Sequence, residues 1–132
     1  IKMADKKIVI STSQRSSIES AKNELAKDIE NIFTSKGETV KHSDGYPGWN
    51  PNTNSKIVRL TAETYERLFG EKAHIRAIHA GLECGLFAEK YPHLDMISFG
   101  PTMRGVHSPD ERLSITATQR FWQLLIEVLK QI

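Results

Sequence analysis

The sequence predicts an α/β fold, in which helices alternate with the strands of a parallel or mixed sheet. Stretches with apolar residues three and four positions apart, typical of amphipathic helices, alternate with short apolar runs of strand length. Two of these runs, residues 74–78 and 96–99, lead directly into glycine-rich segments. Because ligands of open α/β sheets bind at the carboxyl ends of strands, we expect the functional groups in these segments.

The first part of the chain predicts the order strand, helix, strand. Residues 7–12 alternate apolar and polar side chains, as a half-buried strand does. Residues 16–19, Ser-Ser-Ile-Glu, have the form of a capping box, so we expect a helix from there through residue 35. Gly37 is placed to end this helix in a left-handed turn, and a second strand is expected at residues 38–42.

A stretch rich in turn-forming residues follows at residues 44–55. Such a stretch between two patterned regions is typical of a linker or a functional loop, so we place a domain boundary within it. Beyond it the patterns predict, in order, a helix closed by Gly70, a strand at 73–78, a short helix at 82–90, a strand at 95–99, a loop to about Ser114 and a terminal helix to Gln131.

Composition and charge exclude several classes of protein. The chain has no run of eighteen apolar residues and no secretory signal at its start, so we expect neither a membrane protein nor an exported one, and a cytoplasmic location. The single cysteine, Cys84, excludes an internal disulfide and a cysteine-built metal site. The formal net charge is only +2 and no basic stripe stands out, so we expect no nucleic-acid partner.

The number of predicted strands is small for a complete sheet. The 132 residues have the length of one ordinary domain or of two pieces of a larger protein. The part after residue 55 offers only two strands, and a two-stranded sheet is marginal by itself. We therefore expect these strands to extend a sheet whose other strands lie outside this chain, which begins with Ile1 rather than Met.

His107 is the candidate metal ligand. It lies in a polar turn, where a neutral imidazole could reach a metal ion and Asp110 or Glu111 could orient it. The same residues also fit a helix entry with an exposed histidine. One histidine is not a zinc site, and the chain has no H-E-x-x-H spacing. The other histidine and aspartate residues that could bind the same metal ion are His42, Asp44, His74, His79 and His93.

Three further residues are candidates for binding a substrate. Arg15 lies past a predicted strand and beside a helix start, where it could hold a carboxylate through a bidentate pair, although a solvated arginine also fits. Gly81 would let a ligand approach the backbone, and Glu83 could accept a hydrogen bond from a substrate amine. A structural turn followed by an acid that opposes the helix dipole explains the same two residues.

Two other features are assigned structural roles. Cys84 has the setting of a helix start, which lowers the pKa of a thiol, but no pattern of a cysteine hydrolase surrounds it, so we expect a small buried side chain. Residues 46–51 could form an aromatic lip over a cleft, but we favour a proline-rich turn anchored by Trp49.

Two motifs carry a resemblance to a known family. His-Ala-Gly-Leu-Glu-Cys-Gly-Leu-Phe at residues 79–87 and Gly-Pro-Thr-Met-Arg-Gly-Val-His-Ser-Pro-Asp-Glu at residues 100–111 resemble those of the Xaa-His dipeptidases, also called aminoacyl-histidine dipeptidases, peptidase D or cytosol non-specific dipeptidases. The resemblance extends over practically the whole chain but covers only the C-terminal part of the family's length. It implies a zinc metallopeptidase with an α/β catalytic domain and an inserted lid domain, which hydrolyses Xaa-His and other dipeptides with a metal-activated water.

The resemblance also implies a division of the chain and roles for single residues. Residues 1–49 look like the second half of an α+β lid, and residues 50–132 look like the C-terminal α/β segment of the catalytic domain. The family's counterpart of His107 is a zinc ligand, and that of Arg15 is a lid residue that binds the C-terminal carboxylate of the substrate. The counterpart of Gly81 lines the substrate site through its backbone, whereas Glu83 belongs to the motif without an assigned role.

The chain departs from the family pattern in the residues that it lacks. The family's H-x-D ligand motif, bridging Asp, Glu-Glu pair with the general base and further Asp ligand have no counterparts here, since His42-Ser-Asp44 falls in the lid part. The full-length enzyme would hold two zinc ions, whereas one ligand leaves most of the coordination sphere empty. We therefore expect no catalytic residue, no tightly bound zinc and no activity in this chain alone.

The alternative is a non-catalytic, standalone α/β module that binds a small ligand or another chain. It predicts a start codon near Met3 and a self-contained core. If the chain is instead part of a dipeptidase, the surface that the rest of the enzyme normally covers would be exposed. This surface could drive association of like chains through the lid or an exposed sheet edge.

Overall fold

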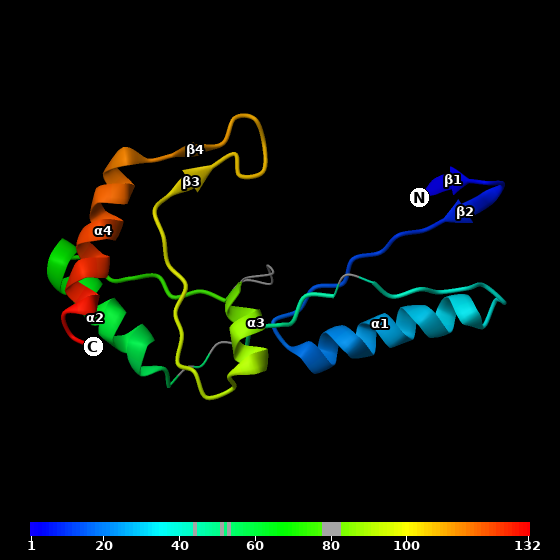
Figure 1. The fold of residues 1–132 in the computed structure, drawn as a ribbon, viewed down its shortest axis with the longest axis horizontal. Coiled ribbons are helices and arrows are strands. Elements are labelled where there is room, and N and C mark those ends of the chain that lie inside the picture. Colours follow the sequence, from blue (N-terminus) through cyan, green and yellow to red (C-terminus); the bar gives the residue numbers. More distant parts are fainter. Residues whose placement is uncertain (44, 51, 53, 78–82) are drawn as a thin grey trace. The chain divides into compact units, whose positions relative to one another are not determined.

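The computed structural model describes residues 1–43, 45–50, 52, 54–77 and 83–132, which form two compact units. The first unit comprises Ile1–Pro51 and Ala77–Pro92, and the second comprises Asn52–Arg76 and His93–Ile132. Each unit combines two helices with one antiparallel hairpin of two strands among the described residues (Figure 1). The assignment of residues 1–49 to a lid and of residues 50–132 to a catalytic domain stays a prediction.

The first unit opens with a hairpin of β1 (Lys2–Ala4) and β2 (Lys7–Val9). Asp5 and Lys6 connect the strands with positive φ angles of 50° and 62°, as the central residues of a type I′ turn have. The strand predicted at residues 7–12 is therefore confirmed over its first part. Its partner β1 lies outside the predicted elements, because the turn lacks the Asn-Gly or Asp-Gly signal of such hairpins.

Helix α1 (Glu19–Thr34) confirms the first predicted helix, but the capping box is wrong. Ile18 occupies the N-cap position without a side-chain cap, and Ser16 Oγ accepts a hydrogen bond from Ile18 N at 3.1 Å. The Glu19 carboxylate is engaged by Lys22 and by a distant backbone amide, so it does not reach back to Ser16. Gly37, at φ +81°, confirms the left-handed turn after the helix.

Helix α3 (Glu83–Lys90) completes the first unit and confirms the predicted short helix over its described residues. The strand expected at residues 38–42 is wrong, because these residues pair with no strand in the part of the chain that the structure describes. His42 instead meets α1, where its Nε2 lies 3.3 Å from Glu30 Oε2.

In the second unit, α2 (Lys56–Phe69) is capped at both ends. The Ser55 hydroxyl accepts a hydrogen bond from Val58 N at 3.0 Å, which satisfies one of the free amides of the first turn. Gly70 closes the helix at φ +71°, as predicted.

Helix α4 (Ile115–Leu129) confirms the predicted terminal helix and packs against α2 (Figure 1). Leu124 and Val128 on α4 are the buried hydrophobic residues of the described chain, and the buried threonines Thr61 and Thr64 lie on α2. The small core of this unit therefore lies between these two helices.

A second hairpin, β3 (Met103–Arg104) and β4 (Arg112–Leu113), precedes α4. The sequence predicts only a loop from residue 100 to Ser114, so the hairpin corrects that expectation. Two residues per strand are too few for an alternation of apolar and polar side chains to be recognised.

The predicted mixture of helix and strand is confirmed, but both sheets of the described chain are antiparallel. Residues 73–77 and 95–99, expected as strands, pair with no other strand among the described residues. An apolar run of strand length becomes a strand only where a neighbour supplies backbone hydrogen bonds, and the run itself does not supply one. The expectation that these runs extend a sheet outside this chain stays a prediction.

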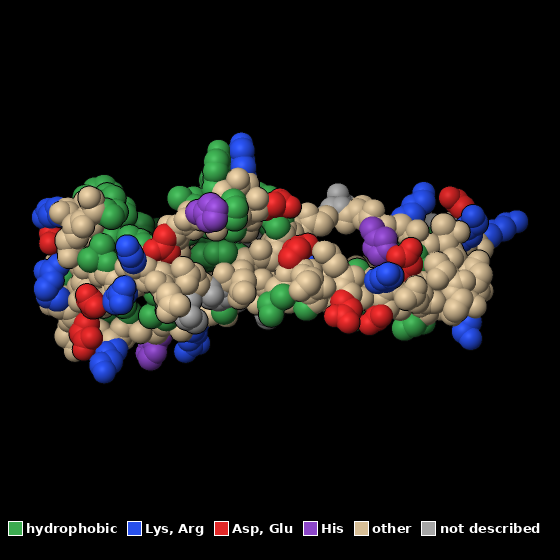
Figure 2. Space-filling view, turned by 90° about the horizontal axis from the view of Figure 1, so that it is seen from below, with side chains coloured by type: hydrophobic (Ala, Val, Ile, Leu, Met, Phe, Trp, Pro, Cys, Tyr) green, Lys and Arg blue, Asp and Glu red, His purple; other side chains and the backbone are tan. Residues whose placement is uncertain are grey.

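Many large apolar side chains lie at the surface. They include Ile8 on the first hairpin, Leu25 and Ile32 on α1, and Trp122 on α4. Figure 2 shows hydrophobic side chains exposed among charged ones on one face. Among the helices that the structure describes, none is long and apolar enough to cross a membrane.

Candidate functional site

His107 lies in the loop between β3 and β4, and short-range hydrogen bonds define the backbone of this loop. Ser108 donates to the carbonyl of Gly105 from its backbone N at 3.1 Å and from its Oγ at 2.6 Å. Gly105 has φ +63°, and a Cβ at this position would lie 2.9 Å from the backbone O of Asp110. Only glycine fits this turn, so the sequence of the motif determines the path of the chain around His107.

The backbone of His107 has φ +65°, a left-handed conformation uncommon for a residue with a side chain. Its backbone N donates to Glu111 Oε2 at 2.9 Å. Glu111 thus holds the backbone of His107, whereas the sequence suggested that Asp110 or Glu111 orients the imidazole. The side chain of His107 is exposed.

The donors of this chain fit a zinc site only in part. His107 offers a nitrogen ligand of the kind that zinc binds, but a zinc site takes at least three protein ligands. Among the described residues, no group of three His, Cys, Asp or Glu side chains could hold a metal ion. Of the suggested companions, Asp44 and His79 lie outside the described residues.

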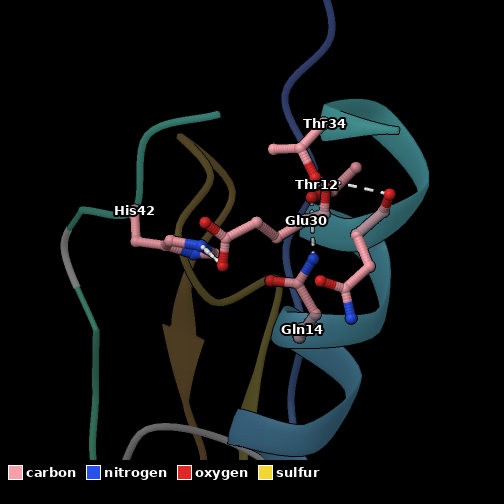
Figure 3. Close-up of polar contacts among 6 residues, drawn as sticks. Thr12, Gln14, Glu30, Thr34 and His42 are labelled. Carbon is pink, nitrogen blue, oxygen red and sulfur yellow. Dashed lines mark hydrogen bonds and ion pairs between the residues drawn. The ribbon is translucent and has the colours of Figure 1, made fainter. Parts of the chain in front are cut away.

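His42 belongs to a polar cluster beside α1 (Figure 3). Its ring points to the carboxylate of Glu30, and Thr34 Oγ1 donates to the backbone O of Glu30 at 2.9 Å. In the same view Gln14 Nε2 donates to Thr12 Oγ1 at 2.7 Å, directly before Arg15. His42 therefore has a carboxylate partner in the first unit, and its exclusion from the ligand motif stays a prediction.

Arg15 is exposed and lies shortly before α1. The next two residues, Ser16 and Ser17, pack their carbonyls against Gly48, since a Cβ at Gly48 would lie 3.0 Å and 2.8 Å from these oxygens. The backbone beside Arg15 is therefore packed against the turn-rich stretch, while the guanidinium side chain lies at the surface.

Glu83 is the exposed first residue of α3, where a carboxylate also stabilises the helix by interacting with the positive end of its dipole. Gly81 lies outside the described residues. Cys84 is half-buried, and burial raises the pKa of its thiol, contrary to the lowering expected at a helix start. A raised pKa disfavours the reactive thiolate, so the structural role predicted for Cys84 is the better one.

The candidate residues are divided between the two units. Arg15 and Glu83 lie in the first unit, and His107 lies in the second. Contacts within the first unit link the neighbourhoods of Arg15 and Glu83, through residues that sequence reasoning did not assign to the site: Glu19, Pro47, Gly48 and Gly85. The available signals were the Pro-Gly-Trp turn and the glycine directly after Cys84.

Comparisons with known proteins agree with the motifs. The family Peptidase family M20/M25/M40 matches residues 5–131. The chain is 42% identical over 132 residues to the cytosol non-specific dipeptidase of Escherichia coli (strain K12). The aligned region is 100% of this chain and 27% of that protein. The crystal structure of the aminoacylhistidine dipeptidase from Vibrio alginolyticus is similar with a TM-score of 0.75 and 41% identity, over 89% of this chain and 24% of that one.

The chain thus spans about a quarter of the length of each of these two relatives. The family match extends over almost every residue of the chain, and it includes both motifs that surround the candidate site. This chain belongs to peptidase family M20/M25/M40.

Proposed function

We propose that this chain is the C-terminal part of a zinc-dependent dipeptidase that hydrolyses Xaa-His and other dipeptides. The observation that carries the proposal is the 42% identity to a dipeptidase along all 132 residues. The name of that relative supports a dipeptide as the substrate and the cytosol as the location. A standalone binding module is not favoured, because the similarity leaves no part of the chain unmatched.

In this proposal His107 provides one ligand of the metal site. Its imidazole is exposed, and its loop is held by the hydrogen bonds to Gly105 and Glu111. Because this loop is already ordered, less conformational entropy is lost when the His107 side chain binds the metal ion. Bound zinc would supply a Lewis acid and an activated water, and the remaining ligands would come from the part of the enzyme outside this chain.

The residues that would bind the substrate lie in the first unit. Arg15 carries an exposed guanidinium, which matches the fork of a carboxylate and would bind the C-terminus of a dipeptide. Glu83 at the start of α3 presents a carboxylate that could accept a hydrogen bond from a substrate amine. The backbone of Gly81 would line the same site.

A further part of the proposal is that the chain by itself is inactive. Among the described residues the donors do not make a metal site, and His107 is the single ligand that the motif identifies. One ligand gives poor metal affinity, because each additional ligand adds binding free energy at little additional cost in entropy.

The proposal can be tested by exchanging the matched segment of the Escherichia coli dipeptidase for these 132 residues. We expect the chimera to hydrolyse a dipeptide that ends in histidine, and the isolated chain to show no turnover. His107→Ala in the chimera should lower kcat/KM by at least about a hundredfold and reduce the zinc content measured by elemental analysis.

The control is Gln123→Ala, which truncates an exposed polar side chain of α4 in the same unit. It should change neither kcat/KM nor zinc content. Unchanged zinc content in the His107→Ala chimera would remove the metal role of His107, and turnover by the isolated chain would contradict its predicted inactivity.

A further inference from the structure

The turn-rich segment at residues 46–49, Tyr-Pro-Gly-Trp, contacts the start of α1 through two hydrogen bonds. Gly48 N donates to Glu19 Oε2 at 2.6 Å, and Lys22 Nζ donates to the carbonyl of Tyr46. Lys22 Nζ also lies 2.8 Å from Glu19 Oε2, so one ammonium group and one carboxylate hold the segment at Tyr46 and at Gly48. We name residues 46–49 the clamp loop.

The carboxylate of Glu19 is suited to this role. Hydrogen bonds from the Lys22 side chain and from the backbone of Gly48 lower its pKa, so it is ionised at neutral pH. Hydrogen bonds to an ionised acceptor are roughly twice as strong as those between neutral groups.

Close backbone packing joins the clamp loop to the segment that carries Arg15. A Cβ at Gly48 would lie 2.8 Å from Ser17 O and 3.0 Å from both Ser16 O and the Ser17 carbonyl carbon. These are backbone atoms, so they cannot turn away as a flexible side chain would. The absence of a side chain at Gly48 therefore lets the loop lie against the residues that directly follow Arg15.

The same loop also contacts helix α3. Gly85 is buried, and a Cβ there would lie 2.7 Å from the backbone O of Pro47. Gly85 comes two residues after Glu83, in the first turn of the helix. A single loop therefore packs against the backbone next to Arg15 and against the helix turn that begins with Glu83.

We propose that the clamp loop positions Arg15 and Glu83 relative to each other, and that Glu19, Gly48 and Gly85 are positioning residues for recognition of a short peptide with a free C-terminal carboxylate. The inference rests on the proposed function, because it takes the substrate roles of Arg15 and Glu83 from there. It adds that two glycines and an acid that do not contact the reacting atoms determine how tightly the C-terminal carboxylate of the substrate is bound. A small displacement of a substrate-binding group can cost on the order of a hundredfold in rate.

The test uses the chimera described above and compares a dipeptide with its C-terminal amide. The ratio of kcat/KM for the acid to that for the amide reports recognition of the carboxylate. We expect Gly48→Ala to lower this ratio by about tenfold or more, with zinc content unchanged. Gly45→Ala is the matched control, since a Cβ there meets nothing within 4 Å, and it should leave the ratio unchanged.

A second pair of variants tests the loop without adding a side chain to it. Glu19→Ala removes the acceptor of the Gly48 amide and should lower the ratio, whereas Glu19→Gln keeps an oxygen acceptor and should restore part of it. In an Arg15→Ala background, Gly48→Ala should cause no further fall, because the carboxylate contact that it displaces is already lost.

The outcomes separate the two proposals. If Arg15→Ala leaves the ratio unchanged, the substrate role of Arg15 fails and the positioning role fails with it. If Arg15→Ala lowers the ratio while Gly48→Ala and Glu19→Ala do not, the positioning role alone is overturned. A fall with Gly48→Ala that is equally large in the Arg15→Ala background would overturn it as well.

Discussion

Asp95 shows how one exposed carboxylate organises the backbone at a distance along the chain. Its Oδ2 accepts hydrogen bonds from Lys56 N at 2.8 Å and from Ile57 N at 3.1 Å, at the start of α2. The side chain of Ser55 also bonds to it and, together with these amides, holds the pKa of Asp95 below its ordinary value of 3.8. Asp95 thus caps α2 together with Ser55 and ties residues 93–99 to that helix.

We predict that Asp95→Ala destabilises the chain by about 1 kcal/mol near neutral pH, the usual loss for a helix cap. Because the pKa is lowered in the folded state, the stabilisation is fully present above pH 3.8 and is lost as the pH falls through the lower, folded value. Urea unfolding followed by circular dichroism at neutral and acidic pH measures both effects, and the difference between wild type and variant should shrink in acid.

Asp110→Ala is a suitable control, since it removes an exposed aspartate from the same unit. A difference between wild type and Asp95→Ala that is the same at both pH values would contradict the proposed role of the charge.

At the scale of elements, the second unit depends on the contact between α2 and α4. Leu124 and Val128 supply its buried apolar surface, and Gln131 Nε2 donates to the buried Thr64 Oγ1 at 3.0 Å. Near the start of α4, the guanidinium of Arg120 lies 4.3 Å from the ring centroid of Phe69 and is ion-paired with Glu71. The apolar contact is small, so single side chains within it should carry much of the packing free energy.

Leu124→Ala should therefore lower the free energy of unfolding by about 2 kcal/mol or more, through lost burial and the cavity that remains. Leu129 is 55% exposed on the same helix, whereas Leu124 is 6% exposed, so Leu129→Ala provides a control with the same change of side chain. Leu129→Ala should cost about 0.5 kcal/mol or less. Equal destabilisation of the two variants in chemical denaturation would show that α2 and α4 do not pack as described.

At the scale of the whole molecule, the chain leaves large apolar residues at the surface. In the first hairpin, the cross-strand partners Met3 and Ile8 are 80% and 71% exposed. A two-stranded sheet also has two open edges, which can pair with strands of other molecules. This surface agrees with the proposal that the chain is part of a longer enzyme.

We predict that the isolated chain self-associates as its concentration rises, and that Ile8→Lys weakens this association. A charge on an exposed strand opposes both apolar contact and edge pairing. Sedimentation velocity over a range of concentrations measures the effect, with Thr12→Lys as a control that adds the same charge at an exposed position outside the hairpin. A single monomeric species at every concentration would refute the prediction.

The sequence by itself determined the helices, the left-handed turns at Gly37 and Gly70, and the family. Each depends on neighbouring residues: the spacing of apolar side chains, a glycine free to adopt positive φ, and motifs of contiguous residues. The same motifs identified His107, although its own left-handed backbone and the contact of its amide with Glu111 appear only in the structure.

Only the tertiary structure decided which groups meet across long stretches of chain. Gly48 and Glu19 lie 29 residues apart in sequence, and Lys56 and Asp95 lie 39 apart. The capping box and the parallel strands were mistaken for the same reason. A carboxylate bonds to the best donor that folding brings near it, and an apolar run becomes a strand only beside a partner, so neither outcome is encoded in the local pattern.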